Sequence, residues 1–402
     1  MKIILNRFKG ISGTVFALGF VSMFMDISSE MVHSLLPLFL VSVIGAGVSS
    51  IGLIEGVAEG AALMVKLFSG VLSDRIGKRK TLAIMGYALG AATKPLFAMA
   101  SGIGLVFTAR FADRVGKGIR GAPRDALIAD ITPPEQHGAA YGLRQAMDTM
   151  GAFIGPLLAM ILMLATSGAY RVIFWIAVIP GAIAVAILVF SVKEPGVART
   201  SPVQRTMTLR NISALGSAYW MIVIFGIVFT LARFSEAFLL LRAENVGLKA
   251  GMAPLIMIVM NVFYSIAAYP AGYLSDRLGS TGIMAFGLAA LIISDLTMAT
   301  AKTVLPVIIG AAIWGLHMGL TQGVLSAMIA NASPADLRGT AFGIFGLASG
   351  IAVLFGSLIA GWLWELFSPA ATFYTGAMFA GCALIGFIFI AGFRGKGRNI
   401  IE

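Results

Sequence analysis

Long apolar stretches alternate with short polar connectors along almost the whole chain. Each stretch is close to the ~20 residues that an α-helix needs to cross the hydrocarbon core of a bilayer. The pattern therefore predicts an all-α integral membrane protein. The twelve predicted transmembrane helices cover residues 13–41, 48–71, 81–100, 104–129, 138–165, 171–192, 215–241, 251–274, 281–301, 304–331, 339–365 and 370–393.

The longest connector, residues 193–214, is polar, basic and contains proline, which is typical of a linker. It separates a predicted N-terminal six-helix bundle, residues 1–192, from a predicted C-terminal six-helix bundle, residues 215–402. About sixteen lysines and arginines lie at the ends and connectors on one side, against about four on the other. Because these residues concentrate on the cytoplasmic side, we expect both termini to be cytoplasmic.

The two predicted halves contain related sequences. Residues 70–77 reappear as residues 272–279, and residues 133–142 recur as residues 334–343. The displacement stays near half the chain length in both cases. Repeated units with a substrate site between them are the usual architecture of secondary transporters. The repeat therefore predicts two pseudo-symmetric bundles that work by alternating access.

The composition agrees with a membrane protein and excludes several other classes. Charged residues make up 12% of the chain, about half of the ~25% typical of soluble domains. The net charge of +11 lies mainly in the connectors, so it does not indicate a nucleic-acid surface. The single cysteine, Cys382, permits neither an internal disulfide nor a zinc site. We expect a monomer without metal or cofactor, retained as a multi-pass protein of the bacterial cytoplasmic (inner) membrane.

Two motifs in this sequence, one at residues 70–79 and one at residues 151–156, resemble signatures of the major facilitator superfamily. Gly151, Gly155 and Pro156 resemble its antiporter motif, although Ala159 stands where glycine is common. In residues 104–129 the arginine that exporters often carry four residues before a Gly-x-Gly pair is replaced by Ala112. The resemblance implies the twelve-helix fold of this superfamily and proton-coupled export. The signature between the second and third predicted helices is carried by Gly70, Leu72, Ser73, Asp74, Arg75, Gly77, Lys78 and Arg79.

The resemblance implies that the connector around Asp74 holds the two halves closed on the cytoplasmic side. A carboxylate there can face a helix N-terminus or arginines, while glycines permit a tight turn. Alternatively, its basic residues only fix the topology. Small residues at 138 and 142, and at 151 and 155, favour close helix packing, with or without a role in export. The predicted gating residues are Gly70, Asp74, Arg75, Gly77, Arg79, Asp276 and Arg277.

Acidic residues lie inside the first two predicted helices, where charges are costly and mark pathways or internal ion pairs. Asp26, Glu30 and His33 share one helix face, and Glu55 and Glu59 are one turn apart. A carboxylate in a low-dielectric cavity can take up a proton near neutral pH. Asp26, Glu30, Glu55 and Glu59 are therefore candidates for proton coupling, the alternative being that they are fixed partners of arginines.

The helix predicted at residues 104–129 carries a stripe of charges that cannot face lipid. Its excess of cations predicts that it attracts an anionic group of the solute, with Arg110, Arg114 and Lys117 as the expected contacts. Arg144 and Asp148 could complete ion pairs with the stripe. His317 is as compatible with a structural role as with a ligand role. The full set of solute-site candidates is Arg110, Asp113, Arg114, Lys117, Arg144, Asp148, Arg233, Glu236, Asn261, His317 and Gln322.

The glycines at 116, 118 and 121 fit a dinucleotide-binding pattern, but that fingerprint requires a preceding strand, and here it lies inside a helix. No nucleophile–base arrangement is apparent, so we expect no enzyme. The sequence favours a proton antiporter that exports a small organic solute, either drug-like or an anionic metabolite such as a siderophore. The alternative is a proton symporter that imports a small organic anion.

Overall fold

The computed structural model describes residues 12–133, 136–192, 215–278, 280–334 and 337–397. Every regular element in these ranges is a helix, and ten segments are long and apolar enough to cross a membrane. Helices α4 (Val48–Ile76) and α6 (Ile103–Asp130) have 29 and 28 residues but are not among the ten. Their length is sufficient for a crossing, whereas their charges lower the hydropathy. The prediction of an all-α fold is thereby confirmed for the described residues, and ten of its segments are candidate membrane spans.

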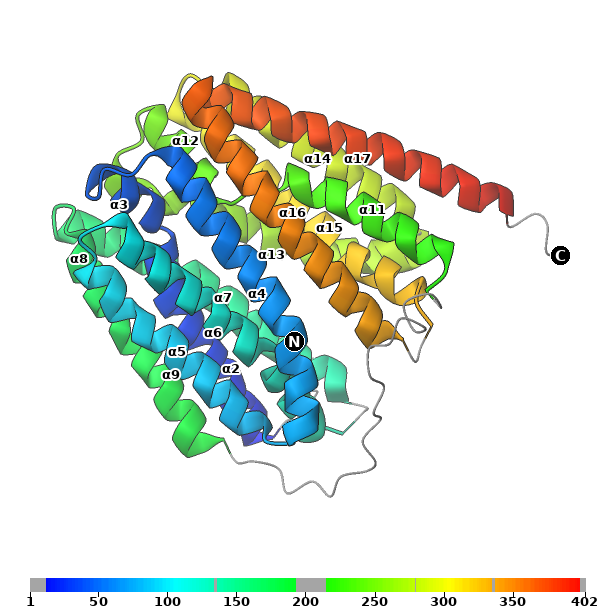
Figure 1. Ribbon diagram of the computed structural model, residues 1–402, viewed down its shortest axis with the longest axis horizontal. Helices are drawn as coiled ribbons and strands as arrows, with labels where there is room; N and C mark the ends of the chain where they lie inside the picture. Colours follow the sequence, from blue (N-terminus) through cyan, green and yellow to red (C-terminus); the bar gives the residue numbers. More distant parts are fainter. Residues whose placement is uncertain (1–11, 134–135, 193–214, 279, 335–336, 398–402) are drawn as a thin grey trace, which may run out of the picture. The chain divides into compact units, whose positions relative to one another are not determined.

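The chain divides into two compact units. In the first unit, α2 packs against α7 and α9, and α5 packs against α6 and α9 (Figure 1). This unit also includes η2, which packs against α7. Besides α6 and most of α4, it contains α2 (Gly13–His33), α3 (Leu36–Ser42), α5 (Arg79–Met99), α7 (His137–Ala165), α8 (Tyr170–Ile176), α9 (Val178–Ser191) and η2 (Ala250–Met252).

The second unit repeats this packing. Helix α11 packs against α16 and α17, and α14 packs against α15 and α17, as α2 and α5 do with their partners in the first unit. This correspondence agrees with the related sequences of the two halves. The predicted linker, residues 193–214, lies outside the described residues. The helices of this unit are α11 (Ser217–Ala232), α12 (Ala237–Asn245), α13 (Pro254–Leu278), α14 (Ser280–Thr300), α15 (Val304–Asn331), α16 (Arg338–Leu366) and α17 (Pro369–Gly397).

The first turns of α4 belong to the second unit, which includes Ala46–Gly56. The backbone N–H and the hydroxyl of Ser49 donate to the two carboxylate oxygens of Glu365 on α16, at 3.1 and 2.6 Å. The carboxylate complements the partial positive charge of the helix N-terminus. A β-carbon on Gly361 would lie 2.9 Å from the Cα of Ser49, so glycine is needed for this approach.

Three helices that were predicted to be continuous are interrupted. Between α2 and α3, Pro37 stands in the first turn of the second piece. Pro180 stands in the first turn of α9, directly after the break at Ala177. Proline cannot donate the helical hydrogen bond, so it is tolerated at a new helix start. The third break, residues 233–236 between α11 and α12, contains no proline and depends on side-chain hydrogen bonds described below.

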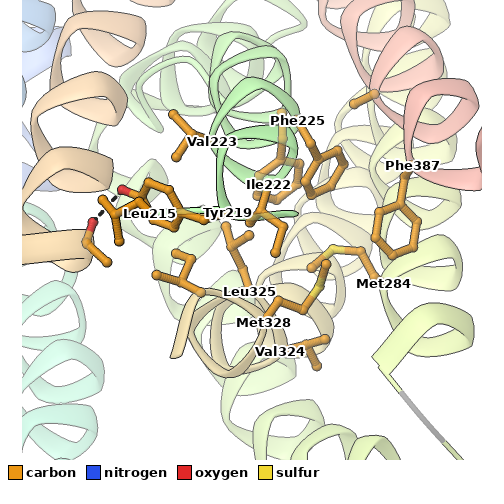
Figure 2. Packing of buried hydrophobic residues seen from close by; sticks show 14 of the residues in the cluster. Leu215, Tyr219, Ile222, Val223, Phe225, Met284, Val324, Leu325, Met328 and Phe387 are labelled. Carbon is orange, nitrogen blue, oxygen red and sulfur yellow. Dashed lines mark hydrogen bonds between the residues drawn. The ribbon is translucent and has the colours of Figure 1, made fainter. Parts of the chain in front are cut away.

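Each unit contains a cluster of buried apolar side chains. In the second unit, this cluster includes Tyr219, Met284, Met328 and Phe387, and the hydroxyl of Tyr219 donates to the carbonyl of Ala341 at 2.8 Å (Figure 2). Large apolar side chains also cover the outside, including phenylalanines at 68, 190 and 367 with exposed fractions of 66%, 85% and 70%. Such a surface is suited to contact with lipid, where van der Waals packing holds the helices together.

Candidate functional site

The charged stripe of α6 is held inside the first unit. Arg110, Asp113, Arg114 and Arg120 are buried, whereas Lys117 is exposed. The stripe is therefore covered by neighbouring helices rather than directed toward lipid, in agreement with the cost of charge in a bilayer. Within it, Lys117 is the cation that remains accessible.

The glycines of α6 allow α5 and α4 to approach this stripe. A β-carbon on Gly116 would lie 2.7 Å from the carbonyl oxygen of Gly86 on α5. A β-carbon on Gly118 would lie 2.7 Å from the carbonyl oxygen of Ala62 on α4. Both positions require glycine because backbone stands opposite. The Gly-x-Gly pair is thus a packing feature of a helix, as its position in the sequence suggested.

Glu59 of α4 compensates two arginines of the stripe. Its Oε1 lies 2.9 Å from Nε of Arg114 and 3.6 Å from an Nη of Arg110. The Glu59 side chain keeps 32% exposure, while both arginines are almost completely buried. A carboxylate at the edge of two buried cations holds a position that an anionic group of a solute could also occupy.

Lys94 of α5 was not among the residues predicted for the site. Its ammonium group lies 2.7 Å from Oδ1 of Asp113 and donates to the hydroxyl of Ser29 at 3.1 Å. This pair joins α5, α6 and α2 at the centre of the first unit. The signal was available in the sequence, because Lys94 is the one charged residue within the apolar stretch 81–100.

The antiporter-like motif lies directly against the two carboxylates of α2. A β-carbon on Gly151 would lie 2.9 Å from Cβ of Asp26, and one on Gly155 would lie 2.7 Å from Cβ of Glu30. Pro156 is buried beside them. The glycines of α7 therefore set the positions of two candidate coupling residues. Gly142, by contrast, has no atom within 4 Å of its missing β-carbon, so its predicted role in close packing is wrong.

The two carboxylates of α2 have different partners. Oδ1 of Asp26 lies 4.0 Å from an Nη of Arg120, and the Asp26 side chain is 28% exposed. Oε2 of Glu30 lies 3.3 Å from Nδ1 of His33, one turn further along the same helix. The contact of Asp26 is at the limit of an ion pair, whereas Glu30 has a hydrogen-bond contact with His33 on its own helix.

A second group of ion pairs lies further along α6. Arg144 and Asp148 of α7 pair at 2.7 Å, and Asp148 also lies 4.0 Å from Arg124. Arg144 in turn lies 3.8 Å from Asp125, which completes a link between α6 and α7. The i, i+4 pair predicted on α7 is therefore present and joins the stripe. The guanidinium of Arg124 also donates to the hydroxyl of Ser22, at 3.0 Å.

Glu55 lies apart from the other coupling candidates, in the second unit. It is buried, and it accepts a hydrogen bond of 3.4 Å from the hydroxyl of Ser235. The same hydroxyl accepts from the N–H of Ala237 at 3.2 Å, and the N–H of Ser235 donates to Ser357 at 3.2 Å. These bonds stabilise the break between α11 and α12, and they place Glu55 at a discontinuous helix.

The remaining candidates of the second unit do not form a cluster comparable to the one in the first. Arg233 and Glu236 are the first and last residues of the helix break and do not lie on one helix, and Arg233 stacks over Phe229 at 5.6 Å. Nδ1 of His317 donates to the carbonyl of Gly287 at 2.8 Å, which supports the structural role of this histidine. Asn261 and Gln322 are half-buried on α13 and α15.

The gating motif is described only in part, because the side chains of Asp74, Arg75, Asp276 and Arg277 lie outside the described residues. Gly77 adopts a left-handed backbone with φ of +68°, which glycine adopts without strain. Arg79 pairs with Asp130 at 3.0 Å and so ties the start of α5 to the end of α6. Gly70 approaches Ala122 of α6, 3.4 Å from its missing β-carbon. The role of the motif as a gate stays a prediction.

Comparison of the sequence with known proteins gives one consistent result. The family model of the Major Facilitator Superfamily matches residues 18–241 and 237–399. An uncharacterized MFS-type transporter of Methanocaldococcus jannaschii, MJ1317, is 33% identical over 380 residues, which cover 92% of this chain and 93% of that protein. The inner membrane transport protein YajR of Escherichia coli is 23% identical over 404 residues, with coverages of 92% and 80%.

Solved structures show the same fold. The nucleoside transporter NupG matches with a TM-score of 0.80 at 14% identity, covering 94% of this chain and 100% of that chain. The peptide transporter POT in complex with sulfate matches with a TM-score of 0.77 at 14% identity, covering 95% and 94%. The two helical units, the intramembrane charges and the match of the family model over most of the sequence lead to one conclusion. The chain belongs to the major facilitator superfamily and is a multi-pass membrane transporter, not an enzyme.

Proposed function

We propose that this transporter is proton-coupled and exports a small organic solute, drug-like or an anionic metabolite of the siderophore type, in exchange for protons. The proposed topology has twelve transmembrane helices in bundles of residues 1–192 and 215–402, with a cytoplasmic linker and cytoplasmic termini. The distribution of lysine and arginine supports this orientation. The proposed location is the bacterial inner membrane, and the proposed state is a monomer.

The weak compensation of Asp26 is the observation that carries this proposal. Glu59 and Asp113 have direct ion-pair partners at 2.9 and 2.7 Å. Asp26 has its described ion-pair contact at 4.0 Å and is partly open to water. A carboxylate that is partly desolvated and loosely paired gains or loses a proton with the smallest disturbance of its surroundings. We therefore assign the proton to Asp26 ahead of Glu30, Glu55 and Glu59.

The solute is proposed to bind beside this carboxylate. Lys117 is exposed, forms no ion pair among the described residues, and lies within electrostatic range of Asp26, Glu30 and Glu59. An anionic group would contact Lys117 and compete with Glu59 for Arg114 and Arg110. A positive or hydrogen-bond-donating group of the solute would contact ionised Asp26.

Antiport follows if solute and proton compete for Asp26. A donor group of the solute binds the ionised carboxylate, and the arrival of a proton weakens that contact and releases the solute. A siderophore-like anion fits the same exchange when its donor groups contact Asp26 while its anionic group contacts Lys117. The antiporter-like motif supports this reading, because Gly151 packs against Asp26 itself.

Symport with an organic anion is the second candidate, and Lys117 is the observation that favours it. Protonation of Asp26 removes a negative charge from the surroundings of Lys117 and so strengthens the binding of an anion there. Proton and solute would then move together. The two candidates differ in whether the solute's main contact is Asp26 or Lys117.

Proton flux in proteoliposomes tests the proposal. Purified protein is first screened for thermal stabilisation by tetraphenylphosphonium, ethidium, citrate and benzoate. The stabilising compound is then added outside liposomes that have an acidic interior and contain a pH-sensitive dye. Antiport is expected to carry protons out as the compound enters, and Asp26→Asn is expected to abolish proton movement while solute exchange continues.

Glu244→Gln is the matched control, since Glu244 lies at the end of α12 outside the charged cluster. It is expected to keep the proton movement of the original protein. If protons instead enter the liposomes together with the compound, the transporter is a symporter and not an antiporter. Transport of the compound without any proton movement would refute proton coupling altogether.

A further inference from the structure

Asp295 is a carboxylic acid enclosed in the interior of the second unit. It lies on α14 with no exposed surface, and neither of its oxygens has a hydrogen-bond partner among the described residues. Oδ2 lies 2.7 Å from the point that a β-carbon on Gly376 of α17 would occupy, and Cε1 of Phe234 lies 2.9 Å from the same point. The carboxyl group therefore fills the space left by a glycine and borders an aromatic ring.

The charged and titratable groups on the neighbouring elements are engaged elsewhere. On α15, His317 donates to the carbonyl of Gly287. Gly287 lies on α14 eight residues before Asp295, which is about 12 Å along the helix axis. The described side chains of α17, residues 369–389, include no charged group. Arg233, next to Phe234 in the chain, stacks over Phe229. On α12, the Arg242 guanidinium donates to the carbonyl oxygens of Met298, Ala299 and Ala301 at 3.0, 3.3 and 2.7 Å.

An ionised carboxylate is not compatible with these surroundings. A buried charge without donors or a counter-ion costs many kcal/mol, and a bilayer around the unit adds no water to relieve it. A metal ion would need several further ligands, and the described residues contain no group of three acidic, histidine or cysteine side chains.

We propose that Asp295 is a proton-binding site of the second unit, which holds its proton in this conformation and exchanges it with water when the conformation changes. The proposal rests on the proton coupling proposed above and extends it, because it gives the second unit a titrating group of its own. The way out for the proton is short. The end of α14 at Thr300 is about 8 Å away along the helix axis, where Arg242 binds the last carbonyls.

Infrared spectroscopy of the protein in a detergent without carbonyl groups tests this assignment without any solute. A protonated carboxyl group has a C=O stretching band that an ionised carboxylate lacks. The Asp26→Asn protein, in which the coupling residue proposed above cannot contribute, is expected to show this band at neutral pH, and the additional substitution Asp295→Asn is expected to remove it. The matched control is Glu365→Gln in the same unit, because Glu365 accepts two hydrogen bonds from Ser49 and is expected to contribute no such band.

A second measurement uses the original protein alone, so it does not depend on the folding of a variant. After transfer to D₂O and a cycle between mildly acidic and mildly alkaline buffer, the band is expected to shift to lower frequency as deuterium replaces the proton. A band that survives Asp295→Asn, or one that never shifts, would overturn the proposal. An exchanging band without proton flux in the liposome assay would refute the coupling mechanism but leave Asp295 as the proton-binding site.

Discussion

The ammonium group of Lys94 lies 2.7 Å from Oδ1 of Asp113, and both side chains are almost completely buried, with exposed fractions of 1% and 4%. The pair connects α5 to α6 in the middle of the first unit, and Lys94 also binds the hydroxyl of Ser29 on α2. Neither charge could remain at this position without the other, because the desolvation of each is offset by its partner.

Removal of one partner is therefore expected to be costly. Lys94→Met leaves Asp113 buried without its counter-ion, and we expect it to lower the free energy of unfolding by about 3–5 kcal/mol. The double variant Lys94→Met, Asp113→Leu is expected to recover most of this loss. Thermal unfolding in detergent measures both effects. Lys80→Met is the control, since Lys80 lies at the start of α5 and donates to the carbonyl of Val189 in an exposed contact. A double variant less stable than either single variant would contradict this account.

Substitution of Lys117 and substitution of Arg114 are expected to have different effects on anion binding and on the free energy of unfolding. Lys117→Gln alters an exposed side chain, so it should weaken binding of an organic anion about tenfold or more while unfolding stays within about 0.5 kcal/mol of the original. Arg114→Gln should weaken binding and also destabilise the protein, because it removes the shortest described ion pair of Glu59 and leaves the more distant Arg110. Calorimetric binding and thermal unfolding separate the two outcomes. Unchanged anion binding in Lys117→Gln would exclude Lys117 as a solute contact.

The two glycines of α7 provide a matched pair for the packing of the antiporter-like motif. A methyl group at Gly155 would meet Glu30 and the backbone of Ile27, at 2.7 and 2.9 Å, whereas one at Gly142 would meet no atom within 4 Å. Gly155→Ala is expected to lower stability by about 1–3 kcal/mol and to reduce transport. Gly142→Ala should be neutral or slightly stabilising, because alanine is the better helix former. Equal melting temperatures for the two variants would argue against the packing role of the motif.

The contact between Ser49 and Glu365 is expected to couple the start of α4 to the end of α16. Ser49→Ala and Glu365→Gln should each lower stability modestly, and the double variant should lose about 1 kcal/mol less than the sum of the two. A double-mutant cycle of thermal unfolding measures this coupling. A coupling free energy of zero would mean that the hydrogen bonds are replaced by water without loss.

The positions of the charged residues made much of the first unit predictable from sequence. A charge inside an apolar stretch must find a partner, and helical spacing alone was enough to match Arg144 with Asp148. The motif at Gly151 and Gly155 was likewise recognised, and the structure adds that it contacts the carboxylates of α2. What sequence could not supply was the pairing between helices, such as Glu59 with Arg114, because it depends on packing angles.

Other features of the site had weaker signals in the sequence. Lys94 was visible in the sequence as a charge in an apolar helix. Its partner Asp113 on α6 had been interpreted as part of the charged stripe, so the pairing between the two helices was not predicted. Glu55 and Glu59 are one turn apart, yet they lie in different units, because α4 passes from one to the other. The break before α12 has no proline, and two of the three hydrogen bonds of Ser235 that stabilise it involve residues more than a hundred positions away. The enclosure of Asp295 likewise depends on the packing of α14 against α17, which its position in an apolar stretch does not reveal.

The pairing of Lys94 with Asp113 also bears on how the chain enters the membrane during synthesis. Lysine or aspartate at the centre of a single helix opposes insertion by about 2.5–3.5 kcal/mol. Helix α6 carries several such charges, so it is poorly suited to leave the translocon alone. Helices α5 and α6 are joined by only a few residues, and the glycines at 86, 90 and 116 let them associate closely. We therefore expect them to be released into the lipid together as a preassembled hairpin, with the ion pair already formed.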